Sequence, residues 1–487
     1  MWDTARPRGV SVNVGWAEMS AGYAPATVTP PRRFLKGLRA ARAGLRNPIE
    51  LWDSALYEVP SRIITRFGGK RFLEIADPLL MHQVLVAEAD AFQRSEFQLR
   101  FTRPLVGAGI LAAVGDNWKA QRRAAAPCFR HQAVAALVPA VDVAGERAVA
   151  KLREGAGPID ILPVMMSATF DVVAELLGVE AGVLDQASID RAADDYLKGV
   201  GLSAIAGIFG LDWLHRLLPL KSRRAAEKLK QEAARAVIAA RRQTDRRGLL
   251  ARLAEVLGDD PVETNNGLRD SVIAFIAAGN ETSAVALTWA LHLIAHDQFV
   301  QDRLAEEARD ALGSGPVTAA NVDALDLHLR VVKEALRLFP PIALVQRTAT
   351  RAVQIGEHAL LPGDEVVCAI YVMHRSERVW DRPEVFDPER FTVEACQRRN
   401  RFAFLPFGAG PHACLGMPLA TMEMVAILAR ITRAVRLDPH SMRPILPVMR
   451  LTLRPEGRAP LTITMRTPIP VRPTQSGDAP EQIAAAA

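Results

Sequence analysis

The sequence has few cysteines, and they do not form the patterns that bind zinc or crosslink small domains. Only four occur among 487 residues, and no two of them are spaced as Cys-x-x-Cys. This argues against a disulfide framework and against a structural zinc site, and it suits a protein of a reducing cytoplasm. The four are Cys128, Cys368, Cys396 and Cys414.

Long runs of one charge and long apolar runs near the start are also missing. The formal net charge is +6, and the basic residues are scattered through helix-like segments, so no nucleic-acid-binding arm is expected. No early stretch has the length of a membrane-spanning helix, so no transmembrane anchor is predicted. With 49% apolar and 23% charged residues, the composition is that of a globular protein with a large core.

The beginning of the chain lacks the periodicity of a folded domain. Residues 1–29 are expected to be a flexible lead, and Met19 is an alternative start. Residues 31–46 are rich in arginine and have an apolar face, which predicts a basic amphipathic helix. Such a helix either packs on its own domain or rests weakly on a membrane surface. The apolar face consists of Phe34, Leu38, Ala41 and Leu45.

The remainder is expected to form one large domain and a tail. Two β-like runs, Arg62–Phe67 and Arg71–Ala76, are split by Gly68 and Gly69 and predict a hairpin. From Pro78 onward the pattern is helical for most of the chain, so the fold class is mainly α with a minor β region. We expect a lead with its helix over 1–47, one domain over 48–467 and a disordered tail over 468–487.

A glycine-rich stretch from Phe407 to Gly416 precedes a helix-like segment and contains a single cysteine, Cys414. Exposed N–H groups at a helix start stabilise a thiolate, and Gly410 and Gly416 would let a flat cofactor approach the backbone. Phe407 could shield the sulfur from water. The alternative is that Cys414 is an ordinary buried cysteine.

The long apolar segment Ser271–His296 predicts a buried helix, but its middle contains polar residues and a glycine. Glycine inside a helix costs about 1 kcal/mol relative to alanine, and a buried carboxylate must be paired or solvated. A local violation of this kind points to a functional site. The alternative is a polar kink with a structural role.

The Cys414 stretch resembles the haem-binding loop of the cytochrome P-450 superfamily, Phe-x-x-Gly-x-x-x-Cys-x-Gly. Phe407, Gly410, Cys414 and Gly416 fill this pattern, while His412 stands where many members have arginine. The resemblance implies haem b, with Cys414 as the axial thiolate of its iron and His412 near a propionate. It also implies a triangular prism of helices with small β-sheets.

Further motifs of the superfamily occur in its order along the chain. Trp118 and Arg122 lie at i and i+4 of a helix; alone they would be a packing residue and a surface charge, but they resemble the pair that binds a propionate. Arg347 resembles another propionate ligand. In the apolar helix the resemblance implies an opening at a glycine that admits O2 and a water, a threonine that donates a hydrogen bond to oxygen, and an acid that relays protons. These positions are Ala278, Gly279, Glu281 and Thr282.

The resemblance also implies structural and substrate-binding residues. Glu334 and Arg337 would otherwise be a surface pair, but they match a Glu-x-x-Arg motif that joins Arg390 in a structural triad behind the cysteine loop. The region 92–110 and the turn of a C-terminal hairpin, with strands near 451–453 and 461–465, are expected at the substrate pocket. Other expected pocket residues are Ala274, Ile342, Ala343 and Leu344.

The implied function is that of a soluble, bacterial-type haem-thiolate monooxygenase that inserts one atom of O2 into an apolar small molecule by hydroxylation or epoxidation. NAD(P)H would act indirectly, through a reductase and a ferredoxin or flavodoxin. An acidic carrier could dock at Arg398, Arg399 and Arg401, which otherwise are solvated loop charges. We expect a cytoplasmic monomer. The alternatives are a peroxide-driven peroxygenase and a non-catalytic haem gas sensor.

Overall fold

The computed structural model describes most of the chain. Three predicted features lie outside the described residues: the flexible lead as far as residue 21, with Met19, the turn at Gly68 and Gly69, and the disordered tail from residue 468. The described ranges are 22–35, 37–65, 71–155, 157–180, 182–196, 220–242, 248–258, 266–441 and 443–467.

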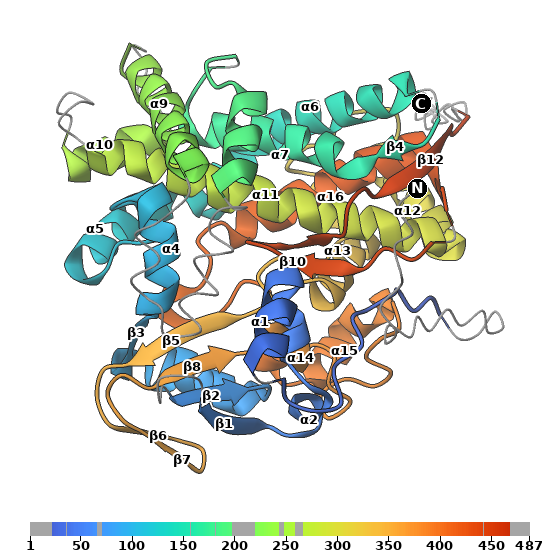
Figure 1. The fold of residues 1–487 in the computed structure, drawn as a ribbon. Coiled ribbons are helices and arrows are strands. Elements are labelled where there is room, and N and C mark those ends of the chain that lie inside the picture. Colours follow the sequence, from blue (N-terminus) through green and yellow to red (C-terminus); the bar gives the residue numbers. More distant parts are fainter. Residues whose placement is uncertain are drawn as a thin grey trace, which may run out of the picture.

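Helices pack around one long central helix, α11 (Asn266–His296), in the larger part of the fold (Figure 1). Its neighbours include α7, α9, α13 and α16, and this surrounding packing explains why residues 283–295 are all buried. The predicted helix over Ser271–His296 is therefore confirmed. The other helices of this part are α5 Gly115–Ala125, α6 His131–Glu154, α7 Ile161–Leu177, α9 Leu220–Arg242, α10 Leu249–Leu257, α12 Gln298–Leu312, α13 Asp326–Leu338 and α16 Met417–Ala434.

One segment of α11, Gly267–His296, is long and apolar enough to cross a membrane, but 72% of its most apolar window is buried inside the protein. Burial by neighbouring helices is the ordinary reason for such an apolar surface in a core helix. The composition of α11 is thus accounted for by its central position.

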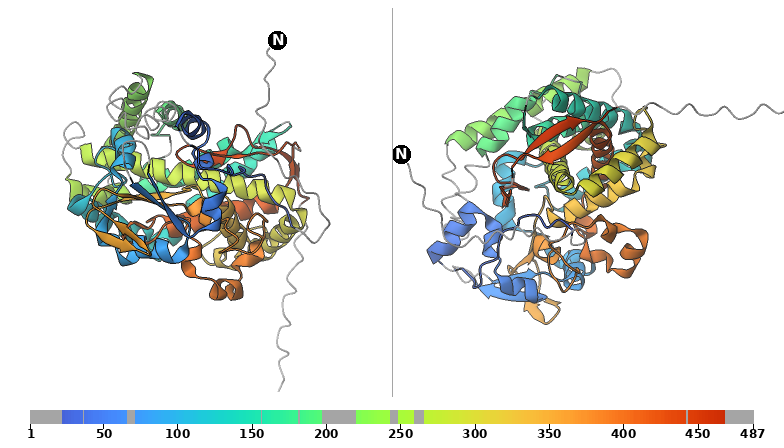
Figure 2. Two further views of the ribbon diagram at one scale, coloured as in Figure 1. Left: turned by 60° about the horizontal axis from the view of Figure 1, so that its bottom comes forward. Right: turned by 90° about the vertical axis from the view of Figure 1, so that its right-hand side faces the viewer.

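A five-stranded sheet in the order β1-β2-β8-β5-β3 lies at the opposite side of the molecule from α6, α7 and α9 (Figures 1 and 2). β1 and β2 form the predicted antiparallel hairpin, and β3 pairs with β5 so that Arg94 lies opposite Arg347. The mainly α class with a minor β region is confirmed. The strands are β1 Ser61–Thr65, β2 Arg71–Ile75, β3 Phe92–Arg94, β5 Val345–Ala349 and β8 Glu365–Cys368.

The C-terminal strands pair differently from the prediction. Residues 450–452 form the turn between β10 and β11, and β12 pairs along its length with β9 and at one end with β4. The expected pairing of 451–453 with 461–465 is therefore wrong, because the two segments belong to different sheets. The strands of the small sheets are β4 Ile159–Asp160, β6 Val353–Ile355, β7 His358–Leu360, β9 Val435–Pro439, β10 Pro447–Met449, β11 Leu453–Pro455 and β12 Pro460–Met465.

The described part of the N-terminal lead is packed on the domain. The Tyr23 ring stacks on His296 with centroids 4.5 Å apart, and the Tyr23 carbonyl accepts a hydrogen bond from the Phe386 amide at 2.8 Å. Residues 22–29 are thus not the flexible chain that was predicted, because the end of α11 and the Phe386 loop hold them.

The basic helix is shorter than predicted. α1 covers Gly37–Arg46, whereas Pro31 is tied to another segment by a hydrogen bond from the Ser54 amide to its carbonyl at 3.0 Å. Phe34 precedes the helix and lies beneath the Arg62 guanidinium. The remaining short helices are α2 Ser54–Glu58, α3 Pro78–His82, α4 Glu96–Val106, α14 Ile370–Met373 and α15 Val393–Arg398.

Candidate active site

The Cys414 loop is shaped by glycines and ends where α16 begins. Gly408 and Gly410 have φ values of 67° and 71°, a region that L-residues adopt only at a cost. The loop then turns back, and the Cys414 amide donates to the Phe407 carbonyl at 2.9 Å. This bond places Phe407 directly beside the cysteine, as the sequence pattern predicts.

The surroundings of the Cys414 thiol act on its pKa in both directions. Burial of the sulfur among protein atoms raises the pKa, whereas backbone N–H groups of Gly416 and Met417 and the Arg122 charge oppose this rise. The residue as a whole is nonetheless accessible at the surface of the chain. Coordination to a metal ion deprotonates a cysteine thiol outright, so the raised pKa does not prevent Cys414 from serving as a metal ligand.

Gly410 also has a steric role that a substitution would reveal. A Cβ atom built on Gly410 would lie 1.8 Å from the Leu85 carbonyl oxygen, whereas one on Gly408 meets no atom within 4 Å. We expect Gly410→Ala to lower the free energy of unfolding by about 2 kcal/mol or more and to reduce haem retention. Gly408→Ala, with a similar φ, should cost only about 1 kcal/mol. Thermal unfolding and haem content of both variants would test this; equal effects would contradict the steric account.

Trp118 and Arg122 of α5 reach the same loop. The Arg122 guanidinium donates to the Ala413 carbonyl at 2.9 Å and lies over the Trp118 ring. Trp118 in turn packs on His412, with ring centroids 4.0 Å apart. The two residues therefore meet at the cysteine loop, and they are not merely a packing residue and a surface charge.

Four cationic or basic side chains converge beside Cys414. Burial lowers the pKa of His412 to about 3, and the charges of Arg94, Arg347 and Arg122 add to this effect. Burial, with the charges of Arg347 and Arg122, likewise lowers the pKa of Arg94 to about 10. The His412 Nδ1 atom is buried and has no hydrogen-bond partner among the described residues. The positive charges of the three arginines repel one another, and the buried His412 nitrogen lacks a partner. Two anionic groups bound here would offset the repulsion and could satisfy that nitrogen.

These residues fit a haem group. Cys414 would hold the iron, and the four basic side chains would bind the propionates, which carry the negative charge that the cluster lacks. The sequence interpretation included Arg122, Arg347 and His412 but missed Arg94. Only the pairing of β3 with β5 brings Arg94 to this place, and no local sequence signal marked it.

The Cys414 loop is linked to α11 by aromatic residues. Phe129 lies 3.8 Å from a Cβ position on Gly416 and stacks on Phe275 of α11, with ring centroids 6.3 Å apart. The polar middle of α11 is therefore held near the cysteine loop by direct packing.

The helix itself is regular through the predicted oxygen-binding motif. α11 is continuous at Gly279, so the local opening predicted there is not present. The glycine instead allows close packing with α7, because a Cβ atom would lie 2.8 Å from Val173. The Thr282 hydroxyl donates a hydrogen bond to the Ala278 carbonyl at 2.6 Å. The hydroxyl must break this hydrogen bond before it can donate to another group.

Glu281, which follows Asn280 in α11, is held by two residues of the C-terminal hairpin. Its Oε1 atom accepts hydrogen bonds from the Thr452 hydroxyl and the Arg454 guanidinium, both at 2.5 Å. This ion pair satisfies the half-buried carboxylate, as burial requires. Neither partner was recognised from the sequence, because each lies about 170 positions further along the chain.

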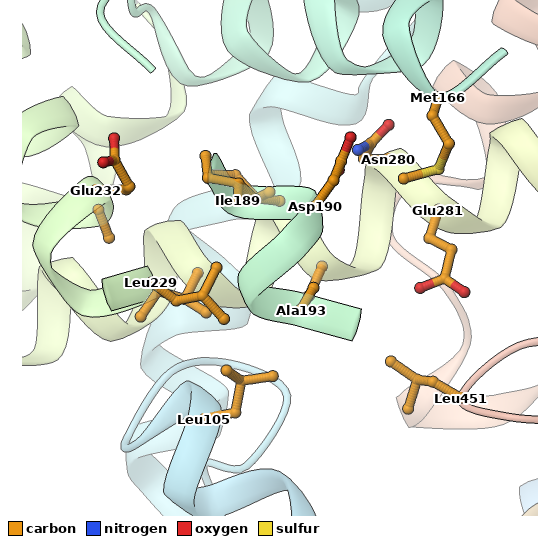
Figure 3. Close-up of a pocket in the computed structure, with 14 residues that line it drawn as sticks. Leu105, Met166, Ile189, Asp190, Ala193, Leu229, Glu232, Asn280, Glu281 and Leu451 are labelled. Carbon is orange, nitrogen blue, oxygen red and sulfur yellow. The ribbon is translucent and has the colours of Figure 1, made fainter. Parts of the chain in front are cut away.

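A cavity lies beside the same stretch of α11 (Figure 3). Leu105, from the region 92–110 that was expected at the pocket, lines it, and so does Leu451. Leu451 was expected in a strand, but it lies in the turn between β10 and β11. The four other predicted pocket residues are not among its lining: Ala274 and Ala343 are buried, Leu344 is half-buried and Ile342 is exposed. Their assignment to the substrate pocket stays a prediction.

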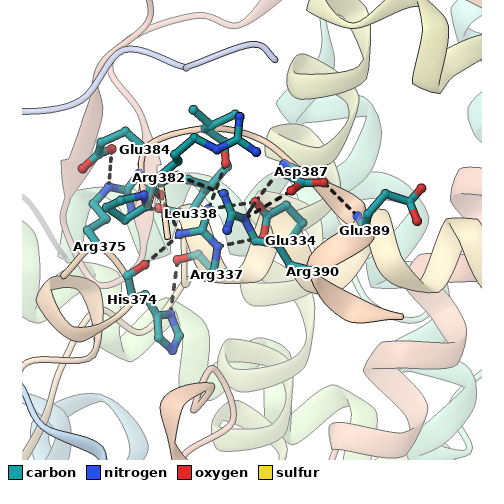
Figure 4. Close-up of polar contacts among 12 residues, drawn as sticks. Glu334, Arg337, Leu338, His374, Arg375, Arg382, Glu384, Asp387, Glu389 and Arg390 are labelled. Atoms are coloured by element: carbon teal, nitrogen blue, oxygen red, sulfur yellow. Dashed lines mark hydrogen bonds and ion pairs between the residues drawn. The ribbon is translucent and has the colours of Figure 1, made fainter. Parts of the chain in front are cut away.

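The predicted triad comes together with Glu334 and Arg337 fully buried and Arg390 half-buried (Figure 4). Arg337 forms two hydrogen bonds of 2.7 Å with Glu334, and Arg390 approaches the same carboxylate at 3.5 Å. Arg337 also donates to the carbonyls of His374 and Pro383. The contacts join α13 to the loops that precede the cysteine, so the triad is a structural unit rather than part of the reacting site.

Comparison with known proteins gives the family. A sequence profile described as Cytochrome P450 matches residues 61–462. The chain is 30% identical over 404 residues to cyclooctatin synthase of Streptomyces melanosporofaciens, an alignment that covers 80% of this chain and 86% of that protein. Identity is 26% over 417 residues to cytochrome P450 4A11 of Homo sapiens (80% and 78%), and 26% over 434 residues to Protein LUTEIN DEFICIENT 5, chloroplastic, of Arabidopsis thaliana (82% and 71%).

The chain therefore belongs to the cytochrome P450 family, and it is a haem-thiolate monooxygenase. Its mostly helical structure with several small sheets is the fold that the sequence resemblance implied. The roles of the individual site residues rest on the geometry described above.

Proposed function

We propose that this monooxygenase inserts one oxygen atom of O2 into an apolar small molecule, by hydroxylation or epoxidation. The observation that carries the proposal is the position of Cys414 beside four basic side chains, one with an unpartnered buried nitrogen. When bound there, haem supplies the redox chemistry. The chain's own share is to hold the cofactor, position the substrate and deliver protons.

Proton delivery is assigned to the middle of α11. Among the described residues the Thr282 hydroxyl bonds within its own helix turn, and Glu281 is a half-buried carboxylate next to it that Thr452 and Arg454 hold. A hydroxyl and a carboxylate at adjacent positions can pass a proton from solvent toward the site. A peroxygenase or a gas sensor would have no use for this pair.

A Thr282→Ala variant should bind haem and substrate normally, but it should consume NADPH without forming the corresponding amount of product. We expect product formation to fall by up to about a hundredfold, within the range that general acid–base groups contribute, while peroxide rises. Peroxide and product per NADPH consumed would be measured with surrogate redox partners. Thr282→Ser retains the hydroxyl and should behave like wild type; full coupling in Thr282→Ala would refute the relay.

Electrons are proposed to come from NAD(P)H through a reductase and a ferredoxin or flavodoxin. Of the three arginines expected to receive an acidic carrier, Arg399 is held between the Trp380 and Phe391 rings and has a structural role. Arg398 and Arg401 remain exposed and carry the docking proposal. We also propose a cytoplasmic monomer, and the four unpaired cysteines support a reducing compartment.

The test of the proposed function is the absorption spectrum of the reduced, haem-loaded protein under carbon monoxide, followed by NADPH-driven turnover with apolar compounds. The red-shifted Soret band of thiolate ligation and the formation of oxygenated product are expected. A band typical of histidine-ligated haem would overturn the assignment of Cys414. Binding of carbon monoxide without turnover, for any compound and electron donor, would favour the gas sensor.

A further inference from the structure

The short loop Gly107–Gly109, which follows α4, is held by side chains of two other helices. Ala108 is exposed to solvent, but both of its backbone groups bond to buried side chains. Its amide donates to the Asp270 carboxylate of α11 at 3.0 Å, and its carbonyl accepts from the Gln121 side chain of α5 at 2.8 Å. Asp270 is 4% exposed and Gln121 0% exposed. Polar groups at this depth need their partners, so the loop and the two helices satisfy one another.

The glycines of this loop are fitted to Asp270 by shape. Gly107 has a φ value of 48°, and a Cβ atom built on it would lie 1.8 Å from the Asp270 Oδ2 atom. A Cβ atom on Gly109 would lie 2.5 Å from the Asp270 carbonyl oxygen. The carboxylate therefore fills space that only glycine leaves free. Its other oxygen, Oδ1, accepts from Arg269 at 3.0 Å.

This attachment lies next to the cavity beside α11. Leu105 precedes the loop by two residues and lines the cavity, and Ile273, one helical turn after Asp270, lines it as well. Figure 3 shows Leu105 on the opposite side of the cavity from Ile189. The loop thus connects the α4 wall of the cavity to its α11 wall.

The end of α4 has little support from its own helix. α4 contains Pro104, which has no N–H to bond to the preceding turn, and the helix ends at Val106. α11, by contrast, is packed among α7, α9, α13 and α16. The position of Leu105 therefore depends on how firmly the Gly107–Gly109 loop is held to α11 and α5.

We propose that Asp270 and Gln121 form a latch on the Gly107–Gly109 loop, which holds the Leu105 wall in place and limits how often it moves aside for a substrate to enter or leave. Both are positioning residues, because they act through the loop and neither lines the cavity. Asp270 is the stronger half of the latch, since its oxygen is charged. The inference rests on the proposed function, whose substrate the cavity would hold.

The first test is hydrogen exchange of the full-length, haem-loaded protein, followed by mass spectrometry. Asp270→Ala should speed exchange in peptides covering 105–113 by about tenfold, because a hydrogen bond to a charged acceptor is lost. Asp270→Asn keeps an oxygen for the Ala108 amide and should recover most of the protection. Asp116→Ala is the matched control: it removes an acid of α5 that is 97% exposed, and exchange should stay at the wild-type rate.

The second test measures ligand exchange by stopped-flow absorbance. The probe is 4-phenylimidazole, an apolar azole that binds haem iron. A wall that opens more often admits and releases the probe faster, so in Asp270→Ala both rate constants should rise about tenfold while Kd changes less than about twofold. Loss of an ordinary packing residue would instead weaken binding. Cyanide, a much smaller iron ligand, should show a smaller change in its rates.

A double-mutant cycle then assigns the effect to the latch. Gly107→Ala should act like Asp270→Ala, because the new methyl group would displace the carboxylate. The three atoms that this methyl would meet all belong to the Asp270 carboxyl group, so the two substitutions together should have little more effect than one alone. Gly115→Ala controls for backbone strain, since its φ is 59° and a Cβ atom there meets no atom within 4 Å.

Three outcomes would overturn the proposal: wild-type exchange in both Asp270→Ala and Gly107→Ala, fully additive effects in the double variant, or faster hydrogen exchange with unchanged ligand rates. If Asp270→Ala does not fold, Gly107→Ala compared with Gly115→Ala decides the matter. The carbon monoxide spectrum of the same preparations separates the latch from the proposed function. A thiolate spectrum with unchanged exchange refutes the latch alone, whereas a failed spectrum refutes the thiolate assignment whatever the exchange shows.

Discussion

A Cys414→Ser variant should lose the red-shifted Soret band of the reduced carbon monoxide complex and all measurable monooxygenase turnover. Serine preserves the size of the side chain and the amide bond to the Phe407 carbonyl, so the loop should keep its shape. What it removes is the thiolate, the ligand whose electron donation distinguishes this haem chemistry. The measurements are the reduced spectrum, haem content and product formation.

The matched control for this prediction is Cys396→Ser. Cys396 is also a free cysteine, in α15 before the cysteine loop, but its sulfur contacts Arg399 rather than that loop. This variant should retain both the band and turnover. A Cys414→Ser protein that keeps the wild-type spectrum would require another residue as the ligand.

A Glu334→Gln substitution should be among the most destabilising single changes in the chain. Glutamine has the shape of glutamate, but it leaves Arg337 as a fully buried charge without its anion, and both side chains are 0% exposed. Breaking a buried ion pair from one side costs about 3 to 5 kcal/mol. We expect a correspondingly lower midpoint of urea unfolding and a poor yield of haem-loaded protein.

The control for Glu334→Gln is an ion pair at the surface. Arg303 contacts Glu389 at 3.1 Å, with the two side chains 39% and 49% exposed. Arg303→Ala should change the free energy of unfolding by less than about 1 kcal/mol. Similar losses in the two variants would mean that the triad is no more important than a surface contact.

The sequence predicted those parts of the site whose residues lie close together along the chain. The loop from Phe407 to Cys414 and the Glu334–Arg337 pair are held by contacts over a few positions, and their spacing is itself the signal. The central helix was likewise predictable from its apolar run. Its continuity at Gly279 was not, because the reason for that glycine is a contact with Val173 of another helix.

Residues brought in by long-range pairing could not be predicted. Arg94 joins the basic cluster through strand register, and Thr452 and Arg454 reach Glu281 from a hairpin far along the chain. No local pattern marks Asp190 and Glu232 as residues of the cavity wall, since nothing local distinguishes an acid that faces solvent from one that faces a cavity. The C-terminal pairing failed for the same reason, because two neighbouring β-like runs joined different sheets.

The hairpin of β10 and β11 has a consequence for anyone who wishes to alter the enzyme's selectivity by mutagenesis. Leu451 shapes the cavity wall, the next residue and Arg454 hold the Glu281 carboxylate, and the Leu453 carbonyl accepts the indole N–H of Trp289 at 2.9 Å. A library that randomised this turn would therefore change pocket shape, acid position and core packing together. Substitutions at Leu105, on the separate helix α4, would change the cavity wall and leave the Glu281 contacts and the Trp289 hydrogen bond in place.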